Sequence, residues 1–199
     1  MNNETLNINK ENVLNAYGTA TDEQKAMLEI IFGKDTFNNP KNIMDRIKTF
    51  KDACNELGSD HPLVLAYQNT NLRDEDVADK NKDIIAYLKL RIIVAALNEG
   101  WEPQFIPGEY RWSPYFILYT KDEIDEMDEE TRARVVVRSG SYAYASGGVS
   151  YAGANYDSAG VDASIGSRLA FKSDELAEYA GKQFIEIYAD FMLCWELKK

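Results

Sequence analysis

The sequence predicts an α+β fold: N-terminal helices, then an antiparallel sheet with Gly/Ser/Tyr-rich hairpins, then a long closing C-terminal helix. In the first half, apolar residues recur at three- to four-residue spacing between recognisable caps. After Trp101 the pattern changes to short aromatic and β-branched runs broken by glycine and serine. Helical spacing returns after Ser173. Because helices and strands are segregated along the chain, we do not expect a doubly wound parallel sheet.

Capping residues delimit the first helices. Thr21 and Gln24 form a capping box ahead of an apolar stripe that ends at Gly33. Residues 39–40, Asn-Pro, begin a second helix, because proline suits the first helical position, and Gly58 ends it. The first stripe contains Met27, Ile30 and Ile31, and the second helix is expected to bury Ile43, Ile47, Phe50 and Cys54.

The strongest helix prediction covers residues 83–99. This segment is apolar on nearly all sides and is closed by Gly100, so we expect a central helix. Before it, residues 62–67 predict one or two helical turns, and the charged residues 74–82 predict a solvated connection. The side chains of the central helix that we expect in the core are Ile85, Leu88, Ile92 and Ala96.

Strand signals follow the central helix. Residues 112–119 are aromatic and apolar almost without a break, which indicates a buried strand with an irregular start at Pro114. An acidic helical segment at 121–131 is expected to turn Ile124 and Met127 inward. Further short strands are predicted at residues 134–138, 142–145, 149–152 and 168–171.

The closing helix begins at Ser173, which is a favourable N-cap followed by acidic residues. We expect it to cover the sheet, because a short hairpin set is not stable alone in water. Gly181 lies mid-helix, where glycine costs about 1 kcal/mol relative to alanine. We therefore expect another backbone or an aromatic ring to approach Gly181 closely. The apolar positions of this helix are Leu176, Tyr179, Ala180, Phe184, Ile187 and Phe191. Of these, Tyr179, Phe184, Ile187 and Phe191 are expected to pack on the sheet that contains residues 135–137 and Leu169.

Length and composition bound the organisation of the chain. Its 199 residues fit a helical appendage at 1–40 and a single α+β domain at 41–199. Cys54 and Cys194 are far apart in sequence, which predicts two reduced thiols rather than a disulfide. The first residues lack the apolar core of a signal peptide, and the most apolar helix is too short to span a bilayer. We expect a cytoplasmic protein without a membrane partner.

The balance of charges is strongly acidic. The net charge is −11 at pH 7 and the pI is about 4.6. A solvated acidic surface explains this balance, and it argues against electrostatic capture of duplex nucleic acid. It leaves open a local basic groove, because net charge does not describe how charges are distributed.

Catalytic and metal-binding patterns are missing from the sequence. The single histidine, His61, precedes Pro62 and is interpreted as a solvated loop residue. No P-loop, GxSxG elbow or GxGxxG motif occurs. The acidic residues 122–130 lack the glycine of an EF-hand loop, and Asp157 and Asp162 are better explained by turn hydrogen bonds than by calcium. We therefore expect no catalytic residues, no metal, no cofactor and no enzymatic activity.

The segment from 139 to 167 instead has the composition of a recognition surface. Single tyrosines stand among glycine, serine and alanine, and such tyrosines give rigid, amphipathic contact area at a low cost in entropy. We expect these loops to contact a partner protein, with a homo-oligomer as a further option. The tyrosines that we expect to bind are Tyr142, Tyr144, Tyr151 and Tyr156.

Aromatic residues near arginines support an alternative. Single-stranded nucleic acids bind to aromatic side chains on a sheet face beside cations. Trp112, Arg138 and Arg168 lie on or beside predicted strands and would serve that purpose. Aromatic packing of a helix on the sheet would explain Trp112 as well, and an ion pair with the acidic segment would explain Arg168.

Three stretches of the sequence are distinctive together: DRIKTF (45–50) with DAC (52–54), ALNEGWEP (96–103), and GSRLAFK (166–172) running into ELAEYAGKQF (175–184), of which the last is the most specific. They resemble a family of small uncharacterised proteins carried by phages and prophages of gut Bacteroidetes, including crAss-like phages. The similarity covers roughly residues 43–193. The resemblance implies a phage or prophage origin and a start in the host-cell cytoplasm, with a place in the virion as an alternative. It brings no functional residue.

A second likeness concerns residues 142–171. Ser/Gly/Tyr-rich hairpins that end in Gly-Ser-Arg-Leu-Ala look like the closing strands of C-type-lectin-like and formylglycine-enzyme-type domains. This likeness implies a lectin-like ligand-binding module. The chain departs from such domains in the long helix that follows Ser173. The leading hypothesis is thus a non-enzymatic binding or structural protein, with a single-stranded nucleic-acid binder and a lectin-like module as alternatives.

Overall fold

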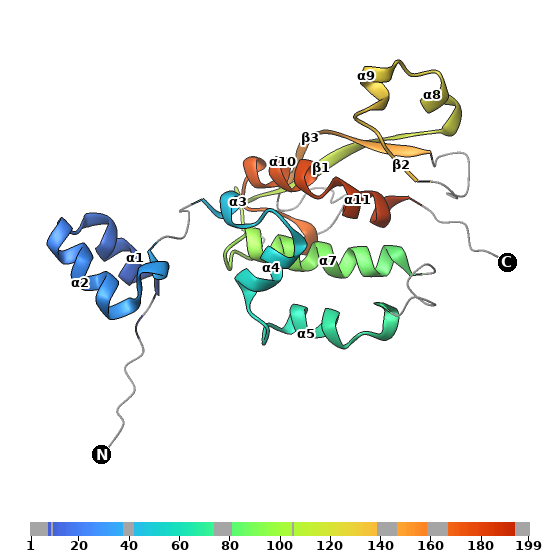
Figure 1. Cartoon of the computed structure of the whole chain (residues 1–199). Helices are drawn as coiled ribbons and strands as arrows, with labels where there is room; N and C mark the ends of the chain where they lie inside the picture. The colour runs from blue at the N-terminus through green and yellow to red at the C-terminus, as the bar shows by residue number, and fades with distance from the viewer. Residues whose placement is uncertain are drawn as a thin grey trace. The chain divides into compact units, whose positions relative to one another are not determined.

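A computed structural model gives the structure of the chain and describes residues 8, 10–37, 42–73, 81–104, 106–138, 147–158 and 167–193. It confirms the predicted α+β class, with helices and, in the described part of the chain, one three-stranded antiparallel sheet (Figure 1). The chain divides into two compact units, Met1–Asn42 and Ile43–Lys199. We describe each unit by itself.

The first unit is a pair of helices, α1 (Lys10–Thr19) and α2 (Asp22–Phe32), followed by the 3₁₀ turn η1 (Lys34–Thr36). The capping box predicted at Thr21 is confirmed, and Gly33 follows the end of α2 with a φ of 84°. The ring of Tyr17 stacks on that of Phe37 at a centroid distance of 4.0 Å. The predicted stripe on α2 is exposed, most of all Ile30 at 85%.

The helical part of the second unit consists of α3 (Ile43–Arg46), α4 (Phe50–Leu57), α5 (Pro62–Asn69), η2 (Asn71–Arg73) and α7 (Lys82–Leu97). The sequence predicted one helix up to Gly58, but α3 and α4 are separate because Thr49 forms a capping box with Asp52. His61 lies in the connection before α5, as interpreted, but it is half-buried rather than fully solvated. His61 is the N-cap of α5, and its Nδ1 accepts a hydrogen bond from the Leu63 N–H at 3.2 Å.

The central position of α7 follows from its contacts with α4, α5 and α11. Two of its four predicted core residues, Ile92 and Ala96, are buried, at 0% and 1% exposure. The other two, Ile85 and Leu88, are only half-buried. The fully buried positions lie instead in the C-terminal part of α7, where helices and the segment around Phe171 surround it. An all-round apolar helix does not show in its sequence which end is covered.

The sheet consists of β1 (Tyr110–Tyr119), β2 (Val136–Val137) and β3 (Gly148–Ser158), in the order β1-β3-β2. The ladder between β1 and β3 runs from the pair Tyr110–Ser158 to the pair Tyr119–Gly148. Its register shifts between Tyr115 and Phe116, which leaves Ala152 as an extra residue on β3. Of the hairpin predicted at 142–152, residues 142–145 lie outside the described part of the chain.

Two short helices, α8 (Lys121–Asp125) and α9 (Glu129–Arg132), connect β1 to β2. The prediction that Ile124 faces inward is confirmed, since it is 2% exposed. Gly147 and Gly148 make room for it: a Cβ at Gly147 would lie 2.6 Å from the Ile124 Cδ1 and 2.8 Å from the Lys121 nitrogen. The two glycines therefore bring α8 close to the sheet.

The segment predicted as a strand at residues 168–171 is a 3₁₀ turn, η3 (Ser167–Leu169), so this prediction was wrong. Only Phe171 pairs with a strand. Its N–H donates to the Trp112 carbonyl at 2.7 Å, and the Trp112 N–H donates back at 3.0 Å. The Ala170 N–H bonds locally to the Ser167 carbonyl, and this local bond replaces a ladder bond.

The predicted closing helix is two helices, α10 (Asp174–Gln183) and α11 (Ile185–Met192). The break lies at Phe184, whose φ of −115° and ψ of 25° are not helical. Ser173 caps α10 as predicted, with its hydroxyl accepting from the Leu176 N–H. Figure 1 shows α10 and α11 as a layer between the sheet and α7, in agreement with their contacts.

The face of α10 and α11 that meets the sheet differs from the predicted one. Gly181, Tyr188 and Ala189 face β1 and β3. The hydroxyl of Tyr179 instead donates to the Ile47 carbonyl at 2.6 Å, and Phe191 stacks on Tyr87 of α7. The reason is that this helical layer is buried on two sides, so both of its faces are apolar.

The close approach predicted at Gly181 is confirmed. A Cβ on this residue would lie 2.7 Å from the Pro114 Cβ of β1 and 2.7 Å from the Tyr151 ring of β3. Real Cβ atoms essentially never come so near another heavy atom. The absent side chain at Gly181 therefore lets α10 pack directly on β1 and β3.

Candidate binding surface

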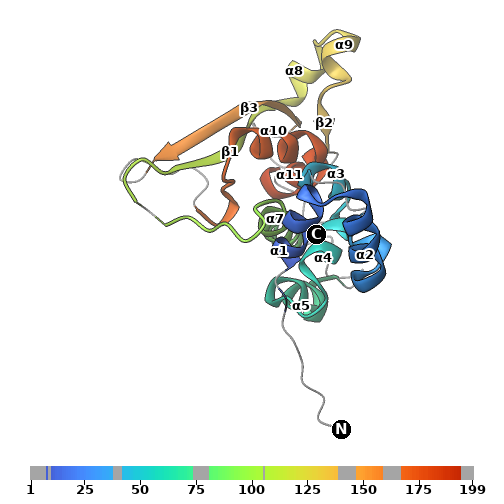
Figure 2. The same ribbon diagram turned by 90° about the vertical axis from the view of Figure 1, so that its left-hand side faces the viewer.

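The end of the β1–β3 ladder at the pair Tyr110–Ser158 carries a cluster of three aromatic rings. Tyr110, Trp112 and Tyr156 share one face of the two strands, and we call them the aromatic triad. The ring centroids of Tyr110 and Tyr156 are 4.9 Å apart with an edge-on geometry, and those of Trp112 and Tyr156 are 5.1 Å apart. Tyr110 and Tyr156 are each 51% exposed. Figure 2 shows this end of β1 and β3 projecting beyond the helical layer.

The backbone holds the triad in place. Trp112 and Tyr156 are cross-strand partners in the ladder. On its other side, Trp112 makes two backbone hydrogen bonds to Phe171, whose own side chain is completely buried. The Trp112 ring packs against the main core. The exposed rings are therefore fixed by strands and core contacts, and they lose little freedom when a ligand binds.

The structure brings together two of the seven predicted binding residues, Trp112 and Tyr156. A third, Tyr151, faces α10 from the middle of the β1–β3 ladder, where it contacts Gly181 and Phe116. Burial and the nearby charge of Glu178 raise the pKa of Tyr151. The Tyr151 ring therefore takes part in the packing of α10 on the sheet, and its predicted role in binding stays a prediction. Tyr142 and Tyr144 lie outside the described residues.

Arg138 binds within the molecule. Its Nε donates to the Asp190 carboxylate at 2.8 Å, and its Nη2 lies 2.6 Å from a carboxylate oxygen of Glu186. Burial by itself would lower the pKa of Arg138, but its hydrogen bonds to both carboxylates outweigh burial and raise the pKa. These contacts join the end of β2 to α11, so Arg138 supports the sheet.

The other arginines near the strands give little support for a cationic groove. Arg111 is only 5% exposed, and Arg134 forms an ion pair with Glu130 of α9. Arg132 and Arg168 are exposed, but they lie on α9 and η3 respectively. The predicted role of Arg168 in binding stays a prediction.

Tyr110 was not among the predicted binding residues. Its place in the triad depends on the register of β1 against β3, which puts it opposite Ser158 and diagonal to Tyr156. The available signal was the spacing of Tyr110 and Trp112, two residues apart, because alternate residues of a strand share a face. That signal does not show which face is exposed.

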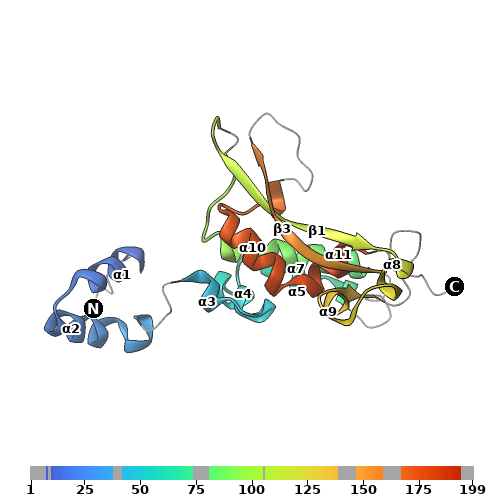
Figure 3. The same ribbon diagram turned by 90° about the horizontal axis from the view of Figure 1, so that it is seen from above.

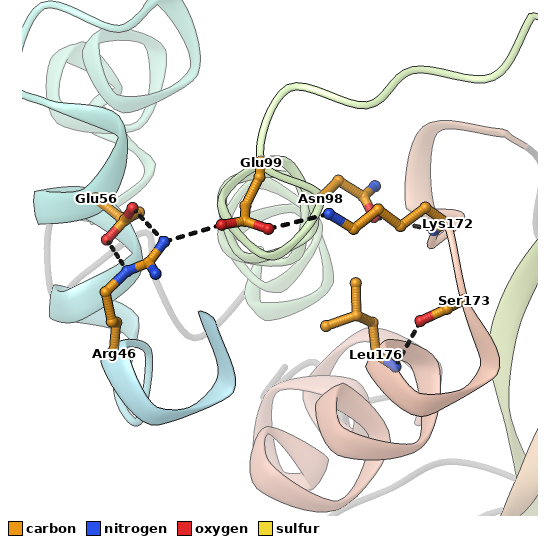
Figure 4. A network of polar contacts seen from close by, with 7 residues as sticks. All are labelled: Arg46, Glu56, Asn98, Glu99, Lys172, Ser173 and Leu176. Atoms are coloured by element: carbon orange, nitrogen blue, oxygen red, sulfur yellow. Dashed lines mark hydrogen bonds and ion pairs between the residues drawn. The ribbon is translucent and has the colours of Figure 1, made fainter. Parts of the chain in front are cut away.

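The three stretches that carry the family resemblance meet in one polar network (Figure 4). Arg46 from the first stretch binds Glu56 at 2.9 Å and Glu99 at 3.1 Å, and Glu99 in turn binds Lys172 at 3.1 Å. The side chain of Asn98 donates to the Ala170 carbonyl at 2.8 Å and accepts from the Lys172 N–H at 3.1 Å. The network joins α3 and α4, the end of α7 and the start of α10.

Glu99 has an unusual backbone conformation. Its φ of 50° makes it the single residue other than glycine with a positive φ in the described part of the chain. A left-handed conformation costs a residue with a Cβ roughly 1 kcal/mol. Burial would raise the pKa of Glu99, but its bonds to Lys172 and Arg46 lower it overall. At this glycine-like position the Glu99 side chain links two cations, Arg46 and Lys172.

Replacing Glu99 with Gln should therefore lower the melting temperature at neutral pH, by an amount that reflects about 0.5–1 kcal/mol for a partly exposed ion pair. Since the folded-state pKa lies below the usual value, this contribution is present above the unfolded pKa and is lost as pH falls through the folded one. Melting curves from pH 7 down to pH 3 should show the two proteins converging. Glu99→Gly, which relieves the backbone, should melt above Glu99→Gln.

Glu102→Gln is the matched control, because Glu102 is exposed and lies outside the network. It should melt like the wild type at every pH. A Glu99→Gln variant that equals the wild type at pH 7 would show that the network does not stabilise the fold.

Among the described residues, no group of three or more His, Cys, Asp or Glu side chains is arranged to hold a metal ion. In the same part of the chain, no helix has the length and apolar character needed to cross a membrane. Comparison of the chain with family models, with curated proteins and with solved structures gives no match. The fold and the surface define an α+β protein with the aromatic triad at one end of the β1–β3 ladder.

Proposed function

We propose that this is a non-enzymatic binding protein, encoded by a phage or prophage, that contacts a partner protein through the aromatic triad. The observation that carries the proposal is the exposure of Tyr110 and Tyr156 at one end of the paired strands β1 and β3. Tyrosine and tryptophan are the residues that most often dominate the free energy of protein–protein binding. The resemblance to phage and prophage proteins supports the origin.

The geometry of the triad suits an apolar partner surface. The two tyrosine rings meet edge to face and each side chain is about half exposed, so apolar ring surface is open to a partner. Because Trp112 fixes the cluster to the core, a partner would bind preformed rings.

The overall charge adds a preference. The protein carries −11 at pH 7, so it attracts partners with basic surfaces and repels acidic ones. The partner that fits best therefore has an apolar centre with basic residues around it. We place the complex in the host-cell cytoplasm, with the virion as the alternative.

A photo-crosslinking experiment tests the proposal. A benzophenone amino acid at position 156 should give a covalent adduct with one dominant protein in the cells that normally make this protein. The same amino acid at Leu65 is the control, since Leu65 is 40% exposed but lies on α5 of the helical part. Adding Tyr110→Ser should reduce the yield at position 156 severalfold.

Two outcomes would contradict the proposal. Equal yields of crosslinked adduct from positions 156 and 65 would mean that the aromatic triad is not a specific binding site. An unchanged yield after Tyr110→Ser, in a variant with wild-type melting temperature, would remove the triad from the contact.

Single-stranded nucleic acid is the second candidate, because the same rings could stack on bases. The weakness of this reading is that Arg138, Arg134 and Arg111 are paired or buried. Fluorescence anisotropy with labelled oligonucleotides at low ionic strength tests it, and no binding there would end it. The lectin-like module stays an untested prediction, and a 3₁₀ turn stands where that likeness suggests a closing strand.

A further inference from the structure

The outer edge of β1 is an open strand edge. In the order β1-β3-β2, β1 has β3 on one side only, and Figure 3 shows β1 on the outside of the sheet. Among the described residues, Phe171 alone pairs with that edge, at Trp112. The part of β1 beyond Trp112 therefore presents backbone groups without a neighbouring strand.

The alternation of the strand determines which groups these are. The N–H and carbonyl of Trp112 point away from β3, toward Phe171, while the Tyr119 carbonyl points toward β3 and accepts from the Gly147 N–H at 2.7 Å. The extra residue of the bulge lies on β3, so β1 itself alternates regularly. The backbone groups of Phe116 and Leu118 consequently point outward.

Both ends of this open stretch are blocked. Pro114 has no N–H to donate. The N–H of Thr120 already donates to the Glu123 carboxylate at 2.7 Å in the cap of α8. Two complete donor–acceptor residues remain, Phe116 and Leu118, and they are two positions apart.

We propose that a second copy of this chain pairs with this edge, antiparallel, around a two-fold axis at Ile117. In that register Phe116 of each copy meets Leu118 of the other, and the two pairs form four backbone hydrogen bonds. Ile117 lies opposite its own counterpart, and Tyr115 lies opposite Tyr119. The N–H and carbonyl groups of Phe116 and Leu118 are then satisfied in both copies, and the isologous contact closes at two copies.

The side chains of this stretch fit the same arrangement. Tyr115, Ile117 and Leu118 are 55%, 42% and 45% exposed. No charged residue occurs from Tyr115 to Tyr119, although natural edge strands are usually protected by charges. An apolar cross-strand pair at the axis and aromatic pairs beside it stabilise the contact, whereas a charged partner strand would find no complement.

The rest of the surface opposes this dimer and gives it a salt dependence. Each copy carries a net charge of −11, so the two copies repel each other over their whole surfaces. Salt screens this repulsion but leaves backbone hydrogen bonds and apolar contacts in place. The dimer should therefore become tighter as ionic strength rises.

Sedimentation equilibrium of the full-length chain over a wide concentration range tests the proposal. The wild type should show a monomer–dimer equilibrium without larger species. Ile117→Lys places two like charges opposite each other at the axis and should weaken dimerisation by about tenfold or more. Val137→Lys on β2, the opposite edge, is the matched control: Val137 is 48% exposed, and this variant should behave like the wild type.

A mixing experiment checks the two-fold axis itself. Ile117→Glu alone should be monomeric, and an equimolar mixture of Ile117→Lys and Ile117→Glu should restore dimers, because the two side chains then face each other as an ion pair. A wild type that is monomeric at all concentrations overturns the proposal. So does an Ile117→Lys variant that dimerises normally, or a mixture without heterodimers. None of these outcomes bears on the proposed binding by the aromatic triad, which lies at the other end of the β1–β3 ladder.

Discussion

Ile92→Asp is expected to prevent folding of the second unit. The Ile92 side chain is 0% exposed and belongs to the main core cluster. A carboxylate there would be buried among apolar side chains without a partner, at a cost of several kcal/mol. Since whole domains are stable by about 5–15 kcal/mol, this one change takes up most or all of the stability. Soluble yield and circular-dichroism melting curves measure the effect.

Ile84→Asp is the control for this substitution. Ile84 lies on the same helix, α7, but is 43% exposed, so the aspartate can remain hydrated. This variant should be soluble and should melt within a few degrees of the wild type. A wild-type yield and melting temperature for Ile92→Asp would show that α7 is not central to the core.

Gly181→Ala is expected to destabilise the protein even though alanine favours helices. The added Cβ would lie 2.7 Å from Pro114 and 2.7 Å from the Tyr151 ring. Separating α10 from β1 and β3 costs about 1–3 kcal/mol of stability. On balance this outweighs the gain of roughly 1 kcal/mol in helix propensity. A net loss of 1 kcal/mol corresponds to a fall in melting temperature of about 2–4 °C for a domain of this size.

Gly153→Ala separates the close approach from a general effect of removing glycine. Gly153 lies on β3, the strand that carries Tyr151, and a Cβ there would meet no atom within 4 Å. The melting temperature of that variant should equal or exceed that of the wild type. If Gly181→Ala raised the melting temperature as well, the close packing of α10 on β1 and β3 would be contradicted.

The sequence predicted those parts of the fold that depend on local chemistry. The caps at Thr21 and Ser173 were found because side-chain oxygen atoms at helix starts have a strong positional preference. The contact at Gly181 was found because a glycine inside a helix is costly and requires a reason. The break at Phe184 was missed because the apolar spacing continues through it without a gap.

The candidate site was predicted only in part, because it depends on contacts between distant residues. Trp112 and Tyr156 meet through a ladder whose register includes a bulge at Ala152, and no local pattern reveals that bulge. Arg138 was expected to be available for a ligand, but Glu186 and Asp190 approach it from a helix about fifty positions later. The prediction placed Tyr179 against the sheet, but its hydroxyl donates to the Ile47 carbonyl on the other side of α10. The sequence did not show the difference, because α10 has apolar residues on both sides.

The strand order has a consequence for how the chain folds during synthesis. β3 is made last of the three strands but occupies the middle of the sheet, so β1 and β2 have no partner until residues 148–158 leave the ribosome. α10 and α11, which cover the sheet, follow even later. Contacts so distant in sequence slow folding and leave apolar strands accessible to neighbouring nascent chains. We therefore expect the translation rate between β1 and β3 to affect the yield of native protein.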